Sequence, residues 1–553
     1  MAACLPVVCT SDPVPAQRVV VIGTRESLQS ALAVKRESPS IVDSVVASDI
    51  ARLPDLNASD AVQRITGVQI VRDRGEGSVV SVRGLVQVET TLNGREVFTA
   101  GSGRTLDFAD IASEMLAGID VYKSSSADRV EGGIGGTIDL RTRRPFDFAG
   151  NAGALGARAI HGHLVDGGAA QLSGLLSRRM QLGGAGELGL LLNLAVQNRS
   201  WREDQKSAGN PLLRSDLVPG QSVVAPNGTS ETVSVGRRQR SAASMALQWR
   251  PSASLELLAE AHFARLETRQ DSQQINVTAG TGFVPGSVTL FPGTSDVRSI
   301  TWTDAPFSVL SFARDTVDRT RQFALGGHWN AAPVTVSADL SHTKSFNHLY
   351  FSGPFFGGRV AQFAHDLSGR VPTTGVSGTD LLEPSNLAYT GLAYRTRPFA
   401  GDLTAARLDV RWQLGDGLIE SVSAGWRHAR RRADNEPGLV FADAPLTGLT
   451  AAGTPGRVLP MPYPHFLDGR GTHIGRFLVG DLDGARDAQG LRDAFGITQP
   501  IPEGANPLTR WRVRETSDAV YGRVDFDAFD GALTGQAGLR LVRMHAATAG
   551  AQS

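Results

Sequence analysis

The feature that most constrains the fold is a two-residue alternation of apolar and polar side chains, which begins after residue 150. In 406–414 the even positions are apolar, while the odd positions between them are charged or amide residues. A strand with this pattern has one apolar face and one polar face. The pattern recurs in 255–263, 334–340 and 520–528. The sequence therefore predicts antiparallel sheet over most of the chain.

The lengths of the connections distinguish two kinds of sheet. Short polar turns lie near Gly183, Pro251, Pro333, Gly415 and Gly531. Long polar stretches with Gly and Pro alternate with them, at 201–235, 269–319, 350–401 and 433–515. Long loops are uncommon in compact soluble domains, whereas outer-membrane β-barrels combine short turns on one side with long loops on the other. Counting this way predicts about eleven strands of a transmembrane barrel.

The first quarter of the chain has a different sequence pattern. Ser48–Asp49 and Ser59–Asp60 are candidate helix caps, and Gly67 is a candidate helix end. The segment 113–118 reads as a short helix that stops at Gly118, and strands are expected at 68–71 and 136–142. Asn93–Gly94 predicts a tight hairpin turn. We expect a compact α+β domain through about residue 148.

Composition and motifs exclude several classes of function. The net charge is +0 and no basic cluster stands out, so no nucleic-acid partner is expected. The two cysteines, Cys4 and Cys9, precede the first domain and offer neither a disulfide framework nor a metal site. His161 and His163 are interpreted as an incidental surface pair. No hydrolase, zinc-peptidase or P-loop motif occurs, so we expect no enzyme, cofactor or metal centre.

Three strings in the first quarter resemble one family, the TonB-dependent outer-membrane receptors. Residues 19–36, VVVIGTRESLQSALAVKR, are similar to the TonB-box region of the subgroup abundant in Xanthomonas- and Caulobacter-like bacteria. Residues 79–108 resemble the core of the plug domain, and residues 128–148, DRVEGGIGGTIDLRTRRPFDF, resemble its end. The resemblance covers the first quarter closely, and the remainder in pattern only.

The resemblance implies a division of the chain. Residues 1–16 are expected to be a signal remnant or disordered terminus, 17–37 the TonB box and linker, and 38–148 the α+β plug. Residues 149–553 are expected to be a partial transmembrane β-barrel with long extracellular loops. Because eleven is odd and half of 22, and because the chain stops soon after a strand, we expect an incomplete, C-terminally truncated barrel of the outer membrane of a Gram-negative bacterium.

The resemblance also implies partners and site residues. Extended, β-branched residues suit addition to a sheet edge of periplasmic TonB, which an inner-membrane complex energises. The TonB-box residues are Val19, Val20, Val21 and Ile22. The plug-core residues are Arg83, Gly84, Asn93, Gly94, Arg95, Glu131, Gly132, Gly133, Gly135 and Gly136. The four glycines from 132 to 136 are interpreted as a packing device between two β segments rather than a phosphate cradle.

Six plug arginines have two interpretations. They either pair with carboxylates on the inward face of the barrel or form a solvated basic surface. The residues are Arg83, Arg95, Arg104, Arg141, Arg143 and Arg144.

The resemblance implies import of a scarce solute across the outer membrane. The subgroup suggests an oligosaccharide, which rings of Trp302, Trp511 and Tyr463 in the predicted loops would stack against. The alternatives are a siderophore or metal-complex receptor of the same architecture, and a nonfunctional receptor fragment with an open sheet edge. Outer-membrane lipid would surround the strands in either receptor.

Overall fold

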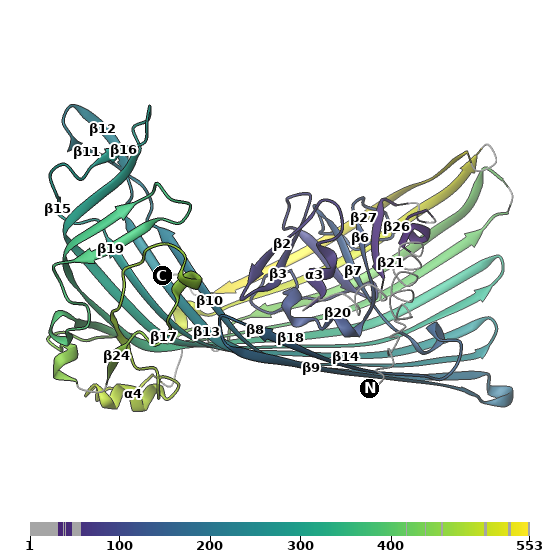
Figure 1. Cartoon of the computed structure of the whole chain (residues 1–553). Helices are drawn as coiled ribbons and strands as arrows, with labels where there is room; N and C mark the ends of the chain where they lie inside the picture. The colour runs from purple at the N-terminus through teal and green to yellow at the C-terminus, as the bar shows by residue number, and fades with distance from the viewer. Residues whose placement is uncertain are drawn as a thin grey trace, which may run out of the picture.

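The computed structural model describes residues 31–36, 38, 40–46, 57–415, 417–436, 438–454, 457–502, 506–528 and 532–550. Within them a small domain lies against one face of a much larger, curved antiparallel sheet (Figure 1). Residues 1–16, the TonB-box segment Val19–Ile22 and the cap expected at Ser48–Asp49 lie outside the described residues.

The small domain is built on a five-stranded sheet in the order β1-β6-β7-β4-β5, in which only β4 and β7 are parallel. Its core contains Val62, Val80, Ile119, Ile138 and Leu140, all buried. A hairpin and a short α-helix also belong to the domain. The elements are β1 (Val42–Val46), α3 (Ala58–Val62), β2 (Val68–Asp73), β3 (Glu76–Val82), β4 (Val88–Leu92), β5 (Arg95–Glu96), β6 (Leu116–Tyr122) and β7 (Gly136–Thr142).

The turn chemistry of the domain follows the sequence closely. Asn93 and Gly94 both have positive φ, 53° and 79°, as a type I′ hairpin turn requires. Gly67 has a φ of 76° and precedes β2. The helix cap is Asn57 rather than the expected Ser59–Asp60, because its side-chain oxygen accepts from the backbone N–H groups of both those residues.

The prediction of a helix that ends at Gly118 is wrong. Ser113–Met115 forms only one turn of 3₁₀ helix (η2), and β6 begins directly at Leu116 and runs through Gly118. The glycine marks an irregularity in the pairing of β6 with β7. A Cβ at this position would lie 2.7 Å from the Arg141 guanidinium, so close packing rather than helix termination explains the glycine.

The large sheet has eleven strands along its main path in the described residues, as the turn count predicted. Every pairing along the path is antiparallel. The strands are β8 (Ala152–Gly162), β9 (Gly167–Gln181), β10 (Glu187–Ala208), β13 (Gly228–Ser252), β14 (Leu255–Thr278), β17 (Val297–Ala331), β18 (Val334–Asp366), β20 (Ala388–Gln413), β21 (Ile419–Asp434), β26 (Trp511–Ala528) and β27 (Leu533–Gly550).

Three of the four predicted long loops are largely strand. Much of 201–235, 269–319 and 350–401 belongs to the far ends of the strands, which turn upward at the left of Figure 1. These ends lack a clean apolar face, so the alternation signal fades. The backbone ladder, however, needs no particular side chain. The stretch 433–515 is the one that remains mainly irregular, with α4 (Ala488–Ala494), β24 (Val458–Pro460) and β25 (Leu478–Gly480).

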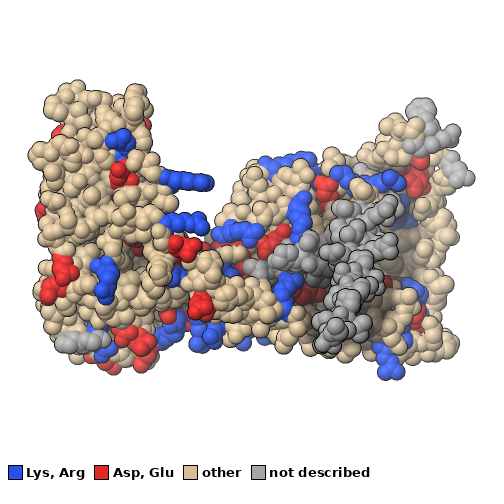
Figure 2. All heavy atoms as spheres, viewed as in Figure 1, with Lys and Arg blue, Asp and Glu red and all other residues tan. Residues whose placement is uncertain are grey.

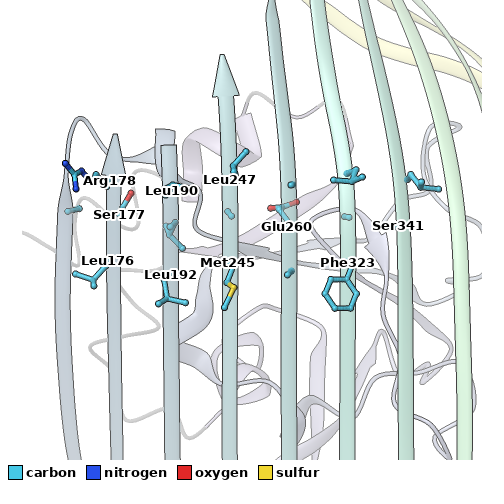
Figure 3. A pocket seen from close by; sticks show the side chains of 18 of the residues that line it. Leu176, Ser177, Arg178, Leu190, Leu192, Met245, Leu247, Glu260, Phe323 and Ser341 are labelled. Atoms are coloured by element: carbon cyan, nitrogen blue, oxygen red, sulfur yellow. The ribbon is translucent and has the colours of Figure 1, made fainter. Parts of the chain in front are cut away.

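The two faces of the sheet differ in chemistry. The face away from the small domain exposes a band of large apolar side chains on neighbouring strands, which Figure 3 shows from close by. The members labelled there are Leu176, Leu190, Leu192, Met245, Leu247 and Phe323. The face toward the small domain is polar and charged. This alternation is the one expected of strands that separate lipid from a polar interior.

The barrel expected from the sequence is an incomplete one with an open sheet edge, and the large sheet does not close within the described residues. The path ends at β8 and β27, and in the described part of the chain these two strands are not paired with each other. The molecule is therefore an open sheet rather than a closed barrel, with an unpaired edge on each side. No helix in the described ranges is long and apolar enough to cross a bilayer.

Candidate functional site between the small domain and the large sheet

The small domain meets the large sheet through buried charges at two places, which we call the acidic corner and the basic corner. At the acidic corner, Glu76 of β3 is fully buried among three arginines of β10 and β13. Its carboxylate lies 2.8 Å from Arg238, 2.9 Å from Arg240 and 3.0 Å from Arg199. One carboxylate therefore neutralises and orders three guanidinium groups of the sheet.

Electrostatics keep Glu76 ionised in this position. Burial alone would raise the pKa of the Glu76 carboxyl, but the positive charges of Arg240, Arg238 and Arg199 lower it below its ordinary value. The neighbouring turn extends the contact, since Asp73 lies 3.0 Å from Arg238 and Arg74 donates to Gln270 of β14 at 2.7 Å. The hairpin tip of the small domain is thus fixed to three strands.

The basic corner has the opposite arrangement. Arg95 of β5 lies between two carboxylates of the sheet, 2.5 Å from Glu260 of β14 and 2.6 Å from Asp339 of β18. Arg144 shares Glu260 at 3.0 Å, and the side-chain amide of Asn93 donates to the same carboxylate at 3.0 Å. Two arginines and an amide of the small domain therefore converge on one buried glutamate.

The six arginines divide between the two interpretations. Arg95, Arg104 and Arg144 pair with sheet carboxylates, Arg104 with Glu515 at 2.7 Å. Arg141 instead pairs with Asp120 inside the small domain, and Arg143 lies over the ring of Phe148. Arg83 is exposed in a tight turn with Gly84, where φ is 55° and 79°, and within the described residues it has no ion pair. The solvated interpretation is the better one for Arg83.

The glycine segment joins the small domain to the last strand of the sheet. Glu131 accepts from Arg540 of β27 at 2.7 Å. Gly132 and Gly136 have φ of 119° and 144°, and a Cβ on Gly133 would lie 2.2 Å from the Gly136 carbonyl oxygen. A Cβ on Gly135 would crowd Leu85 at 3.1 Å. The packing interpretation of these glycines is therefore the one the geometry supports.

A buried carboxyl that forms no ion pair within the described residues lies close to this segment. Glu89 of β4 is 6% exposed, and a Cβ on Gly132 would lie 3.2 Å from its Oε2. Burial, with the negative charge of Glu96 as a second cause, raises the pKa of Glu89 to about 8. Glu89 is therefore largely protonated at neutral pH, in contrast to Glu76.

Sequence reasoning missed the acidic corner. The arginine-rich strings of the small domain predict cations on the plug and carboxylates on the sheet, whereas Glu76 with Arg199, Arg238 and Arg240 has the opposite arrangement. One signal was available: Arg238 and Arg240 share one face of an alternating strand, and two charges on the polar face of a barrel-like strand call for a buried counter-charge.

The aromatic residues expected in loops have different surroundings. Trp302 lies in β17 and is fully buried in an apolar cluster, so its proposed role in stacking on a sugar is wrong. Trp511 is the first residue of β26, with its ring 6.0 Å from that of Phe399. Tyr463 does lie in an irregular stretch, beside Arg202. His161 is in β8, and His163 lies 4.0 Å from Asp468.

Comparison with known proteins identifies the small domain. Residues 34–137 match the family model of the TonB-dependent Receptor Plug Domain. We therefore refer to the small domain as the plug, after the family model that it matches. The match relates this domain to the plugs of TonB-dependent receptors. The subgroup suggested by the sequence is not resolved by this match.

Solved structures give weaker likenesses. The ferric citrate transporter FecA in its unliganded form is 12% identical, with 94% of this chain and 76% of that chain covered and a TM-score of 0.32. A mutant of the ferric enterobactin receptor PfeA from Pseudomonas aeruginosa is 10% identical, covering 93% and 91%, with a TM-score of 0.33. The ferric preacinetobactin receptor BauA from Acinetobacter baumannii is 10% identical, covering 93% and 76%, with a TM-score of 0.34. Scores this low establish no shared arrangement of the whole chain. No curated protein matches.

Proposed function

We propose that this chain is a TonB-dependent importer of a scarce solute, in which the plug blocks passage along the polar face of the sheet until TonB pulls on it. The observation that carries the proposal is the charged contact between plug and sheet at the acidic and basic corners. Charged contacts exchange for water at lower cost than a packed apolar core does, which suits a domain that must move.

The apolar contacts support the same mechanism. The plug has a core of its own, made entirely of residues between 45 and 140. The apolar clusters that it shares with the sheet are small, for example Ala112 and Met115 with Ala195 and Ala242. The plug is thus stable as a unit and weakly bound by apolar surface, so a force directed at its N-terminal end would shift it as a body.

TonB is proposed to engage Val19–Ile22. These residues precede the matched plug and are β-branched, as suits a strand added to a partner sheet. Substituting Val20→Pro removes a ladder N–H, and we expect it to abolish capture of the full chain by the periplasmic domain of TonB. Val20→Thr keeps the N–H and serves as the matched control. Undiminished capture of the Val20→Pro protein would refute the assignment of the box.

Outer-membrane residence follows from the exposed apolar band on the sheet. We expect the chain to fractionate with outer membranes and to require detergent for extraction. Lipid or detergent is needed because it removes the apolar side chains of the band from contact with water. A stable, β-rich monomer in detergent-free buffer would overturn the importer proposal. It would favour instead a chain without transport function.

Two solute classes follow from the sequence, an oligosaccharide and a metal complex. The oligosaccharide candidate relied on three loop aromatics, and burial of Trp302 removes one of them. Uptake assays with a radiolabelled oligosaccharide and with ⁵⁵Fe-labelled ferric complexes, in cells with and without TonB, separate the two classes. Uptake of either that does not depend on TonB would contradict the mechanism.

A further inference from the structure

Positive charge gathers on the face of the sheet away from the plug, beside the apolar band. One row of that band consists of Leu192, Met245, Ala261 and Phe323, which are directly opposed across β10, β13, β14 and β17. Gln322 donates to the plug, so the odd positions around it in β17 face away from the plug. Six cations continue this face toward the upturned ends of the strands. These residues, which we call the outer basic belt, are Arg237 of β13, Arg265 and Arg269 of β14, Arg319 and Arg321 of β17, and Lys344 of β18.

The cations of the belt face one another across neighbouring strands. The six form three directly opposed pairs, Arg237 with Arg269, Arg265 with Arg319, and Arg321 with Lys344. Like charges that are directly opposite each other destabilise an antiparallel sheet. Among the described residues only Glu267 forms ion pairs with the belt, at 2.8 Å from Arg265 and 3.6 Å from Arg269. Asp402 of β20 is opposite Lys344 but forms no ion pair with it. The belt therefore holds more positive charge than its neighbours neutralise.

A cavity of about 540 Å³ lies at the end of the belt farther from the apolar band. Arg237 and Arg269 line it together with Arg486, which belongs to the irregular segment between β25 and α4. Arg486 lies 2.8 Å from Asp315 of β17 and 3.0 Å from Asp271 of β14, so this segment crosses the same face of the strands. Figure 1 shows α4 and β24 on the side of the strands away from the plug. The belt therefore leads into a cavity that the segment helps to enclose.

The outer basic belt lies at the depth at which a bilayer changes from hydrocarbon to headgroups. Arg321 and Arg319 are two and four residues from Phe323, which is about 7 and 13 Å along the strand. The headgroup layer of one leaflet is about 5–8 Å thick, and the tilt of barrel strands reduces the vertical distance. Figure 2 shows Lys and Arg side chains along the underside of the sheet, below the place where the strands turn upward. Short turns join the opposite ends of the strands, for example between Ser252 and Leu255, so the belt lies toward the outer leaflet.

We propose that the outer basic belt binds the phosphate group of an anionic lipid of the outer leaflet, whose headgroup extends into the cavity beside Arg486. This inference rests on the outer-membrane residence proposed above and is independent of the transported solute. Guanidinium groups bind phosphate oxygens through paired, charge-assisted hydrogen bonds. A phosphate between opposed cations such as Arg265 and Arg319 replaces their repulsion by two attractions. The acyl chains of the same lipid would cover the apolar row at Phe323.

Lipid binding to the full chain in a nonionic detergent tests the inference. The probe is dioleoylphosphatidic acid. Its matched control is dioleoylphosphatidylcholine, which has the same acyl chains and a phosphate whose charge the choline cation balances. Titrations followed by native mass spectrometry give the affinity for each lipid, and we expect the anionic lipid to bind at least about tenfold more tightly. Inorganic phosphate at about 10 mM should not displace it, because free phosphate has no acyl chains to cover the apolar row.

Substitutions assign the binding to the belt. Arg319→Gln with Arg321→Gln should weaken binding of the anionic lipid about thirtyfold, about fivefold for each cation near an anionic headgroup. The matched control is Arg370→Gln with Arg476→Gln, which removes the same charge from exposed positions in the connections between strands. Arg319→Lys with Arg321→Lys keeps both charges and should retain most of the affinity, which distinguishes lost charge from an altered fold.

Three outcomes would overturn the inference: equal binding of the two lipids, equal affinity of the glutamine variant and its control, or displacement of the anionic lipid by inorganic phosphate. The last would identify free phosphate as the ligand. A protein that requires detergent but gives one of these results would refute the lipid site alone. A β-rich monomer that is stable without detergent would refute outer-membrane residence instead, whatever its affinity for the lipids.

Discussion

The acidic and basic corners hold the same two bodies together with reversed polarity. At the acidic corner one plug carboxylate, Glu76, serves three arginines of the sheet. At the basic corner the plug supplies the cations, and Arg95 and Arg144 share Glu260. At the acidic corner one group, Glu76, is shared by all three arginines, with Asp73 as a second carboxylate for Arg238 alone, whereas at the basic corner two cations share one carboxylate. Loss of one side chain should therefore have very different effects at the two places.

The difference bears on how the plug is released. A force that withdraws Glu76 removes one shared counter-charge from three arginines at once, which increases the repulsion among them. A force that withdraws Arg95 leaves Glu260 with Arg144. We infer that the acidic corner is the cooperative point of attachment and that the basic corner yields stepwise.

Glu76→Gln tests this inference and should have the largest effect. The substitution keeps the shape but removes the charge that neutralises Arg199, Arg238 and Arg240, and breaking a buried ionic cluster in this way costs about 3–5 kcal/mol. We expect the plug to become sensitive to proteolysis at much lower urea, measured on protein in outer-membrane vesicles. Glu203→Gln, on an exposed residue that accepts from the Arg74 backbone N–H, is the control. Equal resistance of the two variants would remove the distinction between the corners.

Arg95→Gln should cost less, about 1–3 kcal/mol, because Glu260 retains Arg144 while Asp339 is partly exposed to water. Combining it with Arg144→Gln removes both cations from Glu260. The double variant should therefore lose more stability than the two single variants together, in the same urea-dependent proteolysis. Strict additivity would show that the basic corner is not redundant.

The sequence predicted these regions unequally. Alternation and turns located the eleven strands, and Asn93–Gly94 located a hairpin, because both signals are local. The far ends of β10, β13, β17 and β18 were predicted as loops because their side chains lack a consistent apolar face. Contacts such as Glu76 with Arg238 join residues 162 positions apart, and only the packing of plug against sheet brings them together. Arg95 was found because its family motif implied a partner, whereas Glu76 lies outside those motifs.

Glu89 extends the comparison to pH, because it is a buried carboxyl that, unlike Glu76, forms no ion pair with an arginine in the described residues. Its pKa is raised from 4.5 to about 8, so between these values the folded plug binds a proton that the unfolded chain has released. Stability from this group is therefore retained at low pH and lost as pH rises toward about 8. Glu89→Gln should flatten the decline, measured as the difference in urea midpoint from the wild type between pH 5 and 8. Parallel curves for the two proteins would contradict the raised pKa.

Substitution of Arg83 should have the smallest effect, because this arginine belongs to neither corner. It belongs to the same plug-core string as Arg95, but its side chain is exposed and lies in a turn where only the backbone is engaged, with its N–H donating to the Gly67 carbonyl at 2.7 Å. Arg83→Gln should change plug stability by no more than about 0.5 kcal/mol, as is usual for exposed positions. If Arg83→Gln greatly reduced plug retention while Arg95→Gln had almost no effect, position within the motif would matter more than burial of the side chain. The two corners would then not account for attachment of the plug, because exposed charges such as Arg83 would hold it as well as charges withdrawn from water.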